Sequence, residues 1–388
     1  MARVLFHIDL NAFYASAEIL KNSSYEDAPL VVGGMSRRGV VCTASYKARE
    51  YGVRSAMPIG QALELCPHLI VVPADFEWYE TCSQKFFNYI RKFTPYVEPV
   101  SIDECFADVT EVIKNYPRPL DLAWQIQKGL KEELGLSCSI GVAPNRFLAK
   151  MASDMRKPMG ITILRKQEIS KKLWPLPIEE MWGIGKKTAP ILRNHKIETI
   201  GDLADPKNEA LALSILGKSG IHRIQNARGN DSNKLTFTTS IQSISQSTTM
   251  NNDVEDYEEI KIIFRRLAHD LSNRCLEEKV QGKTISISIR YSDFSTIVRS
   301  FTMEKAISKM DPILEHALYL FDKNHVSGQP IRHLGIALGS LINQDHTIEQ
   351  ISFFEPQSIT KNDILNELNK NFDSPKLKFA SELLKNKC

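Results

Sequence analysis

Residues 3–9 read Arg-Val-Leu-Phe-His-Ile-Asp, a short apolar run that ends in an acid, and this pattern is typical of a buried strand. Residues 97–109 read Val-Glu-Pro-Val-Ser-Ile-Asp-Glu-Cys-Phe-Ala-Asp-Val and predict a hairpin around Asp103 and Glu104. Neighbouring residues of a regular strand point to opposite faces, so these two acids can share a site only at a turn or kink. The two stretches predict a sheet that carries acids at its edge.

Asp9, Asp103 and Glu104 form the candidate catalytic set. Hard carboxylates without a His or Cys in the motif select Mg²⁺ or Mn²⁺ rather than zinc. Two such ions about 4 Å apart activate the attacking oxygen and neutralise the leaving oxygen of a phosphoryl transfer. Taken alone, the three acids could equally be ordinary surface charges.

The composition is that of a soluble globular protein: 43% of the 388 residues are apolar and 24% are charged. This length predicts two to four domains. The net charge is only +3, but residues 146–172 carry eight basic side chains against two acids, while residues 98–111 carry five acids and no Lys or Arg. Such segregation suits metal-dependent chemistry on a polyanion, although solvated faces would give the same pattern.

The seven cysteines form no Cys-x-x-Cys pair, which predicts reduced thiols rather than disulfides or a zinc site. The N-terminal apolar run is too short for a signal peptide, and no segment approaches the roughly 20 apolar residues that span a bilayer. We therefore expect a soluble, cytoplasmic protein.

Strands and helices alternate over the first 165 residues, which predicts an α/β unit with a mixed sheet. The predicted strands are 3–9, 30–32, 40–43, 97–102, 105–109, 137–142 and 161–164, and the helices are 12–20, 45–51, 77–92, 120–134 and 145–155.

The character changes after residue 177. Residues 178–230 are expected to be helical, and residues 231–240 are polar and typical of a linker. A second α/β unit follows. Its predicted strands are 240–248, 284–291, 297–302 and 331–338, and its helices are 255–277 and 311–323.

Several basic and hydroxyl side chains could bind phosphate. Tyr46 and Arg49 lie three residues apart, on one face of a predicted helix, and Lys157 falls within the basic stretch. A triphosphate needs an Arg fork, a Lys point charge and a hydroxyl donor, which these residues offer. A solvated helix face is the alternative.

A helix–hairpin–helix pattern links two short helical segments, 178–181 and 187–194. Its glycines let backbone N–H groups approach a DNA phosphate at a helix N-terminus. The predicted DNA contacts are Gly183, Gly185, Lys186, Lys187 and Thr188, with a poorer second copy at 217–220.

A further surface could grip the DNA backbone. Ser286, Ser288 and Arg290 alternate along a predicted strand and would share one of its faces, although a solvent-facing sheet is equally consistent.

Six motifs in order closely resemble the Y-family translesion DNA polymerases of the DinB/UmuC type, over about residues 1–350. They are HIDLNAFYASAE from residue 7, TASYKAR from 43, GVRSAMP from 52, SIDE from 101, GVAPNRFLAKMASD from 141 and WGIGKKT from 182. The resemblance implies a multidomain α/β right hand with a mixed-sheet palm, small fingers, a helical thumb and an α/β little finger. The implied bounds are 1–10 and 75–165 for the palm, 11–74 for the fingers, 166–231 for the thumb, 232–240 for a linker, 241–345 for the little finger and 346–388 for a tail.

By this resemblance, Asp9, Asp103, Glu104 and the Leu10 carbonyl would hold two Mg²⁺ ions, with Mn²⁺ as a substitute. Tyr46, Arg49 and Lys157 would grip the triphosphate of a dNTP.

The resemblance also implies how the nucleotide is selected. Phe13 and Tyr14 match an aromatic pair beneath the sugar, and Tyr14 would be the steric gate that excludes a ribose 2′-OH. Small residues, Cys42 and Thr43, would lie over the incoming base. A loose pocket implies low fidelity and tolerance of damaged templates, and no segment resembles a proofreading exonuclease.

Asn11 departs from the pattern, because many DinB-type members carry an acid there. This weakens a DinB assignment without threatening catalysis. Two other classes compete with this interpretation. One is a non-catalytic DNA-binding paralogue, which the intact acids argue against, and the other is a nucleotide cyclase, which the helix–hairpin–helix and little-finger segments argue against.

The expected partners are primer–template DNA, a dNTP and the bacterial sliding clamp, bound by a monomer. The clamp would recognise an extended peptide, whose apolar side chains fill a groove. That peptide is Gln350, Ile351, Ser352, Phe353 and Phe354.

Overall fold

The computed structural model describes residues 3–36, 38–232, 234–237 and 240–343. Gln350–Phe354, the predicted clamp peptide, therefore lies outside the described residues. The chain divides into two compact units, one of Met1–Ile241 with Thr249–Val254 and one of Gln242–Thr248 with Glu255–Cys388. Among the described residues, every helix is too short or too polar to cross a bilayer.

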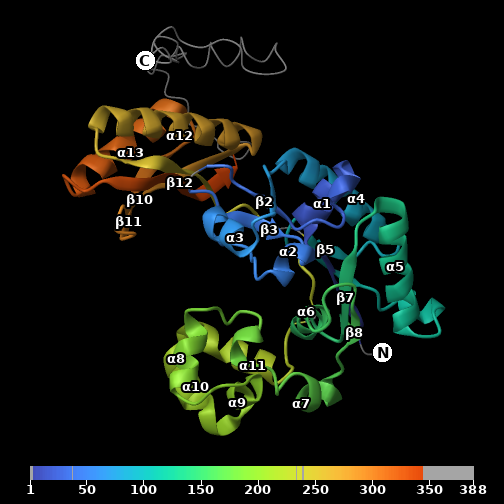
Figure 1. Ribbon diagram of the computed structural model, residues 1–388. Helices are drawn as coiled ribbons and strands as arrows, with labels where there is room; N and C mark the ends of the chain where they lie inside the picture. The colour runs from blue at the N-terminus through green and yellow to red at the C-terminus, as the bar shows by residue number, and fades with distance from the viewer. Residues whose placement is uncertain (1–2, 37, 233, 238–239, 344–388) are drawn as a thin grey trace, which may run out of the picture. The chain divides into compact units, whose positions relative to one another are not determined.

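A five-stranded mixed sheet organises the first unit (Figure 1). Strand β1 runs antiparallel to both β6 and β7, and β7 runs parallel to β8. In sheet order the strands are β5 (Val97–Pro99), β6 (Glu104–Asp108), β1 (Leu5–Leu10), β7 (Cys138–Ala143) and β8 (Ile161–Ile163). The predicted hairpin is confirmed, although its first strand ends at Pro99 instead of residue 102.

The two faces of this sheet pack against different helices. Phe6, Ile8 and Leu10 join the core beneath α4 (Phe76–Arg91) and α5 (Pro119–Leu134). Leu5, on the other face, packs with α6 (Arg146–Asp154).

Because side chains alternate along a strand, His7 and Asp9 face α6 together with Leu5. Asp9 also lies opposite Glu104 in the β1–β6 register. Phe106, two residues after Glu104 and therefore on the same strand face, packs in the core beside α6. The sheet therefore sends Asp9 and Glu104 toward one helix.

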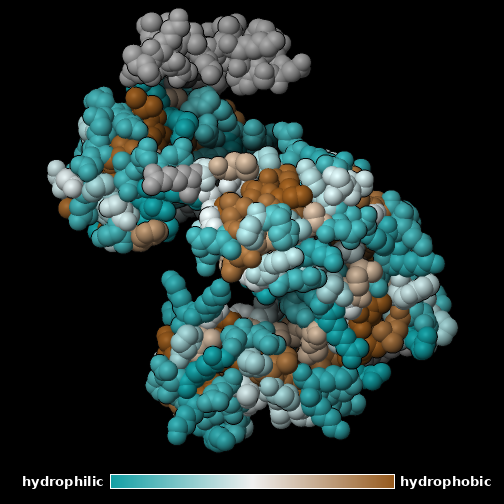
Figure 2. Space-filling model, viewed as in Figure 1, coloured by the Kyte–Doolittle hydropathy of each residue, from teal (hydrophilic) through white to brown (hydrophobic). Residues whose placement is uncertain are grey.

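A small three-stranded sheet forms a second layer in the same unit. Its order is β3 (Val41–Ala44), β2 (Leu30–Gly33) and β4 (Ile70–Val72), with helices α1 (Phe13–Lys21), α2 (Tyr46–Glu50) and α3 (Ile59–Leu65). Residues 59–72, to which the sequence analysis assigned no element, thus supply α3 and β4. Figure 2 shows hydrophobic side chains gathered over β2 and α3 on an otherwise largely hydrophilic face.

Short helices complete the first unit, and the helical character predicted for residues 178–230 is confirmed. They are α7 (Ile169–Lys172), α8 (Thr188–Asn194), α9 (Ile200–Ala204), α10 (Glu209–Leu216) and α11 (Gly220–Ala227). The first segment of the helix–hairpin–helix is a single 3₁₀ turn, Ile178–Glu180.

The second unit is built on a four-stranded sheet with two helices, although Thr249–Val254, at the end of one of its strands, belong to the first unit (Figure 1). Its order is β11 (Thr296–Ile307), β10 (Val280–Tyr291), β12 (Ile331–Asn343) and β9 (Ser243–Val254), and its helices are α12 (Tyr257–Glu277) and α13 (Met310–Asn324). The strands are longer than predicted. Ile285, Ile287 and Ile289 are buried and alternate with Ser286 and Ser288, which are half-buried.

Candidate active site

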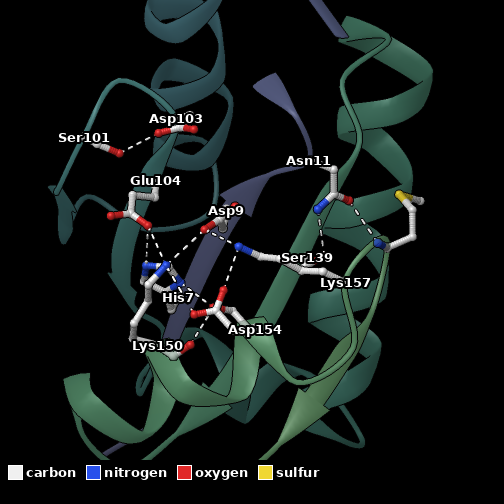
Figure 3. Close-up of polar contacts among 12 residues, drawn as sticks. His7, Asp9, Asn11, Ser101, Asp103, Glu104, Ser139, Lys150, Asp154 and Lys157 are labelled. Carbon is white, nitrogen blue, oxygen red and sulfur yellow. Dashed lines mark hydrogen bonds and ion pairs between the residues drawn. The ribbon is translucent and has the colours of Figure 1, made fainter. Parts of the chain in front are cut away.

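Two of the three predicted catalytic acids meet on the α6 side of the sheet (Figure 3). Asp9 is the fifth residue of β1 and only 8% exposed, and Glu104 opens β6 directly opposite it. Single ligand atoms of His7, Asp9 and Glu104 all lie within 4.8 Å of one another. These carboxylates thus converge from two adjacent strands.

Two lysines hold the Asp9 carboxylate. Lys150 Nζ, from α6, lies 3.1 Å from Asp9 Oδ2 and 2.8 Å from Glu104 Oε2. Lys157 Nζ lies 2.7 Å from Asp9 Oδ2 and 2.7 Å from Asp154 Oδ1. From the sequence, Lys150 was predictable only as part of the basic stretch 146–172. Lys150 and Asp154 are four residues apart, which places them on one face of a helix, and this spacing was the one feature of the sequence that indicated an ion pair there.

Asp103 occupies a separate position. It precedes β6, its carbonyl accepts a 3.0 Å hydrogen bond from the Leu10 amide, and its Oδ1 accepts one of 2.6 Å from Ser101 Oγ. Asp103 and Glu104 are therefore adjacent in the chain, but Asp103 makes different polar contacts from the Asp9–Glu104 pair. Figure 3 shows Asp103 beside Ser101, away from the two lysines.

Burial and charge shift the pKa values of these acids in opposite directions. Burial raises the pKa of Asp103, and the neighbouring charges of Asp9 and Glu104 add to the increase. Burial alone would raise the pKa of Glu104 too, but the nearby His7 ring and the hydrogen bond from Lys150 outweigh it and hold that pKa well below its usual range. Asp103 is thus the more easily protonated of the two.

His7 lies under the site with no exposed side-chain surface. Its Nδ1 is 2.8 Å from Ser153 Oγ, and its Nε2 is 3.4 Å from Glu104 Oε2. Burial lowers its pKa, so the ring is neutral near pH 7. Sequence reasoning missed this residue, although its alternation with Asp9 along β1 placed both on one face.

The donor set fits a divalent cation of the magnesium type. The Lys150 ammonium already shows that Asp9 and Glu104 enclose a positive charge. The carboxylate oxygens of Asp9 and Glu104 suit such an ion, because hard cations prefer oxygen ligands. The roles of Asp103 and the Leu10 carbonyl as further ligands stay predictions.

The predicted triphosphate contacts lie near this cluster. Ser45 caps α2 by accepting a hydrogen bond from the Ala48 amide, and α2 carries Tyr46 and Arg49. The Arg49 guanidinium lies 4.7 Å from the centre of the Tyr46 ring. Burial raises the pKa of Tyr46, and the charges of Arg49 and Lys157 counter part of that rise. Tyr46 therefore shares the electrostatic environment of Arg49 and Lys157.

Tyr14 is held by a cluster of aromatic rings. It stacks on the buried Tyr79 at 4.4 Å between centroids and 15° between planes, and Phe76 meets it edge-on at 6.0 Å. The Tyr79 hydroxyl donates a 2.6 Å hydrogen bond to Glu18 Oε1. Phe13, its predicted companion, is 2% exposed and tilted against it. Tyr14 thus has a fixed platform beneath it.

The two small residues predicted to lie over the base occupy β3. Cys42 is exposed and Thr43 is half-buried, whereas their neighbours Val41 and Ala44 belong to a core. Burial raises the pKa of Tyr14, and Asp103 and Cys42 add to the rise, so both of these residues lie near Tyr14.

Asn11 bridges two parts of the sheet. Its Nδ2 donates a 2.9 Å hydrogen bond to Ser139 Oγ, and its Oδ1 accepts one of 2.9 Å from the Met159 amide. Met159 follows Lys157 by two residues, so Asn11 fixes the segment that carries that lysine. Asn11, which stands where many DinB-type members carry an acid, thus makes structural contacts.

Replacing Asn11 with Ala should destabilise the fold and weaken dNTP binding. It leaves Ser139 Oγ and the Met159 N–H without these partners, at a cost of about 1–3 kcal/mol. Urea unfolding and the KM for dNTP in primer extension measure the two effects. Asn11→Asp keeps an acceptor for the Met159 N–H, and its second oxygen can accept from the Ser139 hydroxyl, so this variant should restore most of both properties. Equal losses in the Ala and Asp variants would contradict the bridging role.

The predicted DNA contacts lie on exposed segments of both units. Gly183 has a φ of +92°, which favours glycine, and the exposed Gly185, Lys186 and Lys187 lead into α8 at Thr188. In the second unit Arg290 is exposed on β10, on the same strand face as Ser286 and Ser288. Their contacts with DNA stay predictions.

Comparison with known proteins decides the family. Sequence profiles described as the impB/mucB/samB family, its HHH motif and its C-terminal domain match residues 8–154, 166–197 and 241–353. A protein of Bacillus velezensis named DNA polymerase IV is 41% identical, over 95% of this chain and 91% of its own length. The chain belongs to the Y-family of DNA polymerases.

Other relatives of this family agree. DNA polymerase IV 1 of Bacillus subtilis is 40% identical over 99% of this chain and 94% of its own. A solved Y-family polymerase chimera has a TM-score of 0.79 at 27% identity, covering 88% of this chain and 99% of its own. An insertion ternary complex of Dbh DNA polymerase, with the same identity and coverage, has a TM-score of 0.61. The multidomain α/β polymerase fold expected from the sequence is confirmed.

Proposed function

We propose that this protein is a low-fidelity, template-directed DNA polymerase that copies past damaged bases by two-metal nucleotidyl transfer from dNTPs, without proofreading. The observation that carries the proposal is the meeting of Asp9 and Glu104 across adjacent strands, with Asp103 next in the chain. The names of the relatives, DNA polymerase IV, support the same activity.

The chain's own residues supply positioning and charge. When bound, two Mg²⁺ ions would activate the primer 3′-oxygen and neutralise the leaving pyrophosphate. Lys157, which contacts Asp9 and Asp154, is close enough to the acids to meet a triphosphate that lies against them. Arg49 and Tyr46 would hold the same triphosphate from α2, as a fork and a hydroxyl donor.

The domain assignments follow from this role. We assign the palm to 1–10 and 75–165, the fingers to 11–74, the thumb to 166–231 and the little finger to 241–345, with a linker at 232–240 and a tail from 346. Primer–template DNA would contact the glycine turn before α8 and the polar face of β10. The similarity to Dbh DNA polymerase in an insertion ternary complex supports binding of DNA and nucleotide together.

Primer extension tests the proposal directly. The wild type should add nucleotides with Mg²⁺ on an undamaged template and opposite an abasic site, and Asp103→Ala should add none. Failure of the wild type to add any nucleotide would refute polymerase activity. Extension that stops at the abasic site would refute lesion bypass alone.

The proposal that the protein binds a sliding clamp rests on the sequence of Gln350–Phe354. Replacing Phe353 and Phe354 with Ala should weaken clamp binding by at least about 30-fold, because buried aromatic anchors carry about 2 kcal/mol or more. Surface plasmon resonance against the clamp measures this, while distributive synthesis should persist. Phe372→Ala in the same tail is the matched control. Clamp affinity retained by the double variant would exclude the segment.

A further inference from the structure

Lys150 contacts the two acids that the proposed function assigns to metal binding. Its ammonium lies 3.1 Å from Asp9 Oδ2 and 2.8 Å from Glu104 Oε2, and its side chain is only 13% exposed. Charge-assisted hydrogen bonds of this length are strong. Two carboxylates beside the ammonium favour its charged form.

The ammonium and a divalent ion would compete for the same oxygens. Asp9 Oδ2 and Glu104 Oε2 accept hydrogen bonds from Lys150 (Figure 3), and the carboxylates of these two residues belong to the group that could share an ion with His7. Two cations at van der Waals distance repel each other strongly in a partly buried site. A metal ion that takes these oxygens must therefore displace the ammonium.

A displaced Lys150 has a second anionic partner on its own helix. Asp154 Oδ2 lies 3.6 Å from Lys150 Nζ, one turn along α6, and the Asp154 side chain is 44% exposed. The ammonium can move toward Asp154 and water without becoming a buried, unpaired charge, which would be costly. The helix thus provides both positions of the exchange.

We propose that Lys150 is a positioning residue, an internal counter-cation that holds Asp9 and Glu104 together and exchanges with the metal ion. The inference rests on the proposed two-metal function. It implies that the protein by itself binds the ion weakly, because binding includes the displacement of Lys150. An arriving triphosphate would favour the exchange, since it offers Lys157 an anion other than Asp9.

Binding of Mn²⁺ alone, without DNA or nucleotide, tests the exchange. The full chain is titrated with Mn²⁺ and the free ion is followed by electron paramagnetic resonance. Lys150→Met removes the competing charge and should bind Mn²⁺ about tenfold more tightly, a conservative value for one unit charge near the ion. It should also melt at a lower temperature in EDTA, and Mn²⁺ should stabilise it more than the wild type. Unchanged or weaker Mn²⁺ affinity would overturn the proposal.

A matched control is Lys172→Met. Lys172 forms an ion pair with Glu168, also four residues away on the chain, but it lies on α7. Lys172→Met should leave the Mn²⁺ affinity unchanged. A tenfold tighter binding of Mn²⁺ by this variant would show that the loss of any lysine charge has the same effect, and it would overturn the specific role of Lys150.

A second measurement needs no substitution at Lys150. The wild type is acetylated with and without Mn²⁺, and labelling of Lys150 is compared with that of Lys172 by mass spectrometry. Displacement should raise the Lys150 signal several-fold, and an unchanged ratio would overturn the exchange. If wild type and Asp9→Asn both fail to bind Mn²⁺, the proposed metal function itself fails, which is distinguishable from a wild type that binds and does not exchange.

Discussion

Asp103→Asn and Glu104→Gln are both expected to abolish nucleotide addition while changing stability in opposite directions. Each substitution removes an oxygen charge from the proposed metal site. The rate of the chemical step should fall by about a thousand-fold or more, the upper end of what the loss of one preorganised electrostatic contact costs. Single-turnover primer extension at saturating dNTP measures this rate.

The stability effects follow from the pKa shifts. The pKa of Glu104 is lowered in the fold, so its ionised form stabilises the protein above the ordinary carboxyl pKa, and this stability is lost as pH falls through the folded value. The pKa of Asp103 is raised, so its ionised form destabilises the protein near neutral pH, and the penalty is relieved as pH falls. Asp103→Asn should therefore raise the melting temperature at pH 7, and Glu104→Gln should lower it.

Thermal unfolding at pH 7 in EDTA checks both signs, and a repeat near pH 4 should shrink the gain from Asp103→Asn. Glu111→Gln, at an exposed acid shortly after the end of β6, is the control for a general loss of negative charge. Equal shifts for Asp103→Asn and Glu104→Gln would contradict the environments described for the two carboxylates. Retained synthesis in either variant would remove that acid from the catalytic set.

The catalytic strands could be predicted from the sequence because their pattern is local. A run such as Val-Leu-Phe-His-Ile-Asp is too apolar and too short for another element, and it became β1. The hairpin carrying Asp103 and Glu104 was predictable for the same reason. Alternation along β1 also implies that His7 and Asp9 share a face.

Other parts depend on tertiary contacts that no local pattern encodes. Residues 59–72 form α3 and β4, but a three-residue strand gains its stability from pairing with β2 rather than from its own sequence. The bridge from Lys150 to Asp9 joins residues 141 positions apart. The contacts of Asp103 differ from those of Glu104 because the Ser101 hydroxyl donates a hydrogen bond to Asp103. The sequence shows only that Ser101 and Asp103 are two residues apart, and this spacing does not predict the bond.

Tyr14→Ala should relax the choice between dNTP and rNTP by roughly 100-fold, the scale on which a pocket discriminates a small substituent by size. The Tyr14 ring cannot sink to make room for a 2′-OH, because it rests on Tyr79 at 4.4 Å, and Tyr79 is buried and held by Glu18. Removing the ring opens that space. The measurement is the ratio of kcat/KM for dNTP and rNTP opposite the same template base.

Two further variants separate the ring from its hydroxyl and its support. Tyr14→Phe keeps the stacked ring and should keep the wild-type selectivity, because exclusion by size needs no hydrogen bond. Tyr79→Leu removes the flat platform and should lower selectivity by less than Tyr14→Ala, since Tyr14 itself remains and Phe76 still meets its edge. Selectivity unchanged in Tyr14→Ala would refute the gate. Loss of selectivity in Tyr14→Phe would instead show that the Tyr14 hydroxyl discriminates between dNTP and rNTP. The stack on Tyr79 would then serve only to orient that hydroxyl.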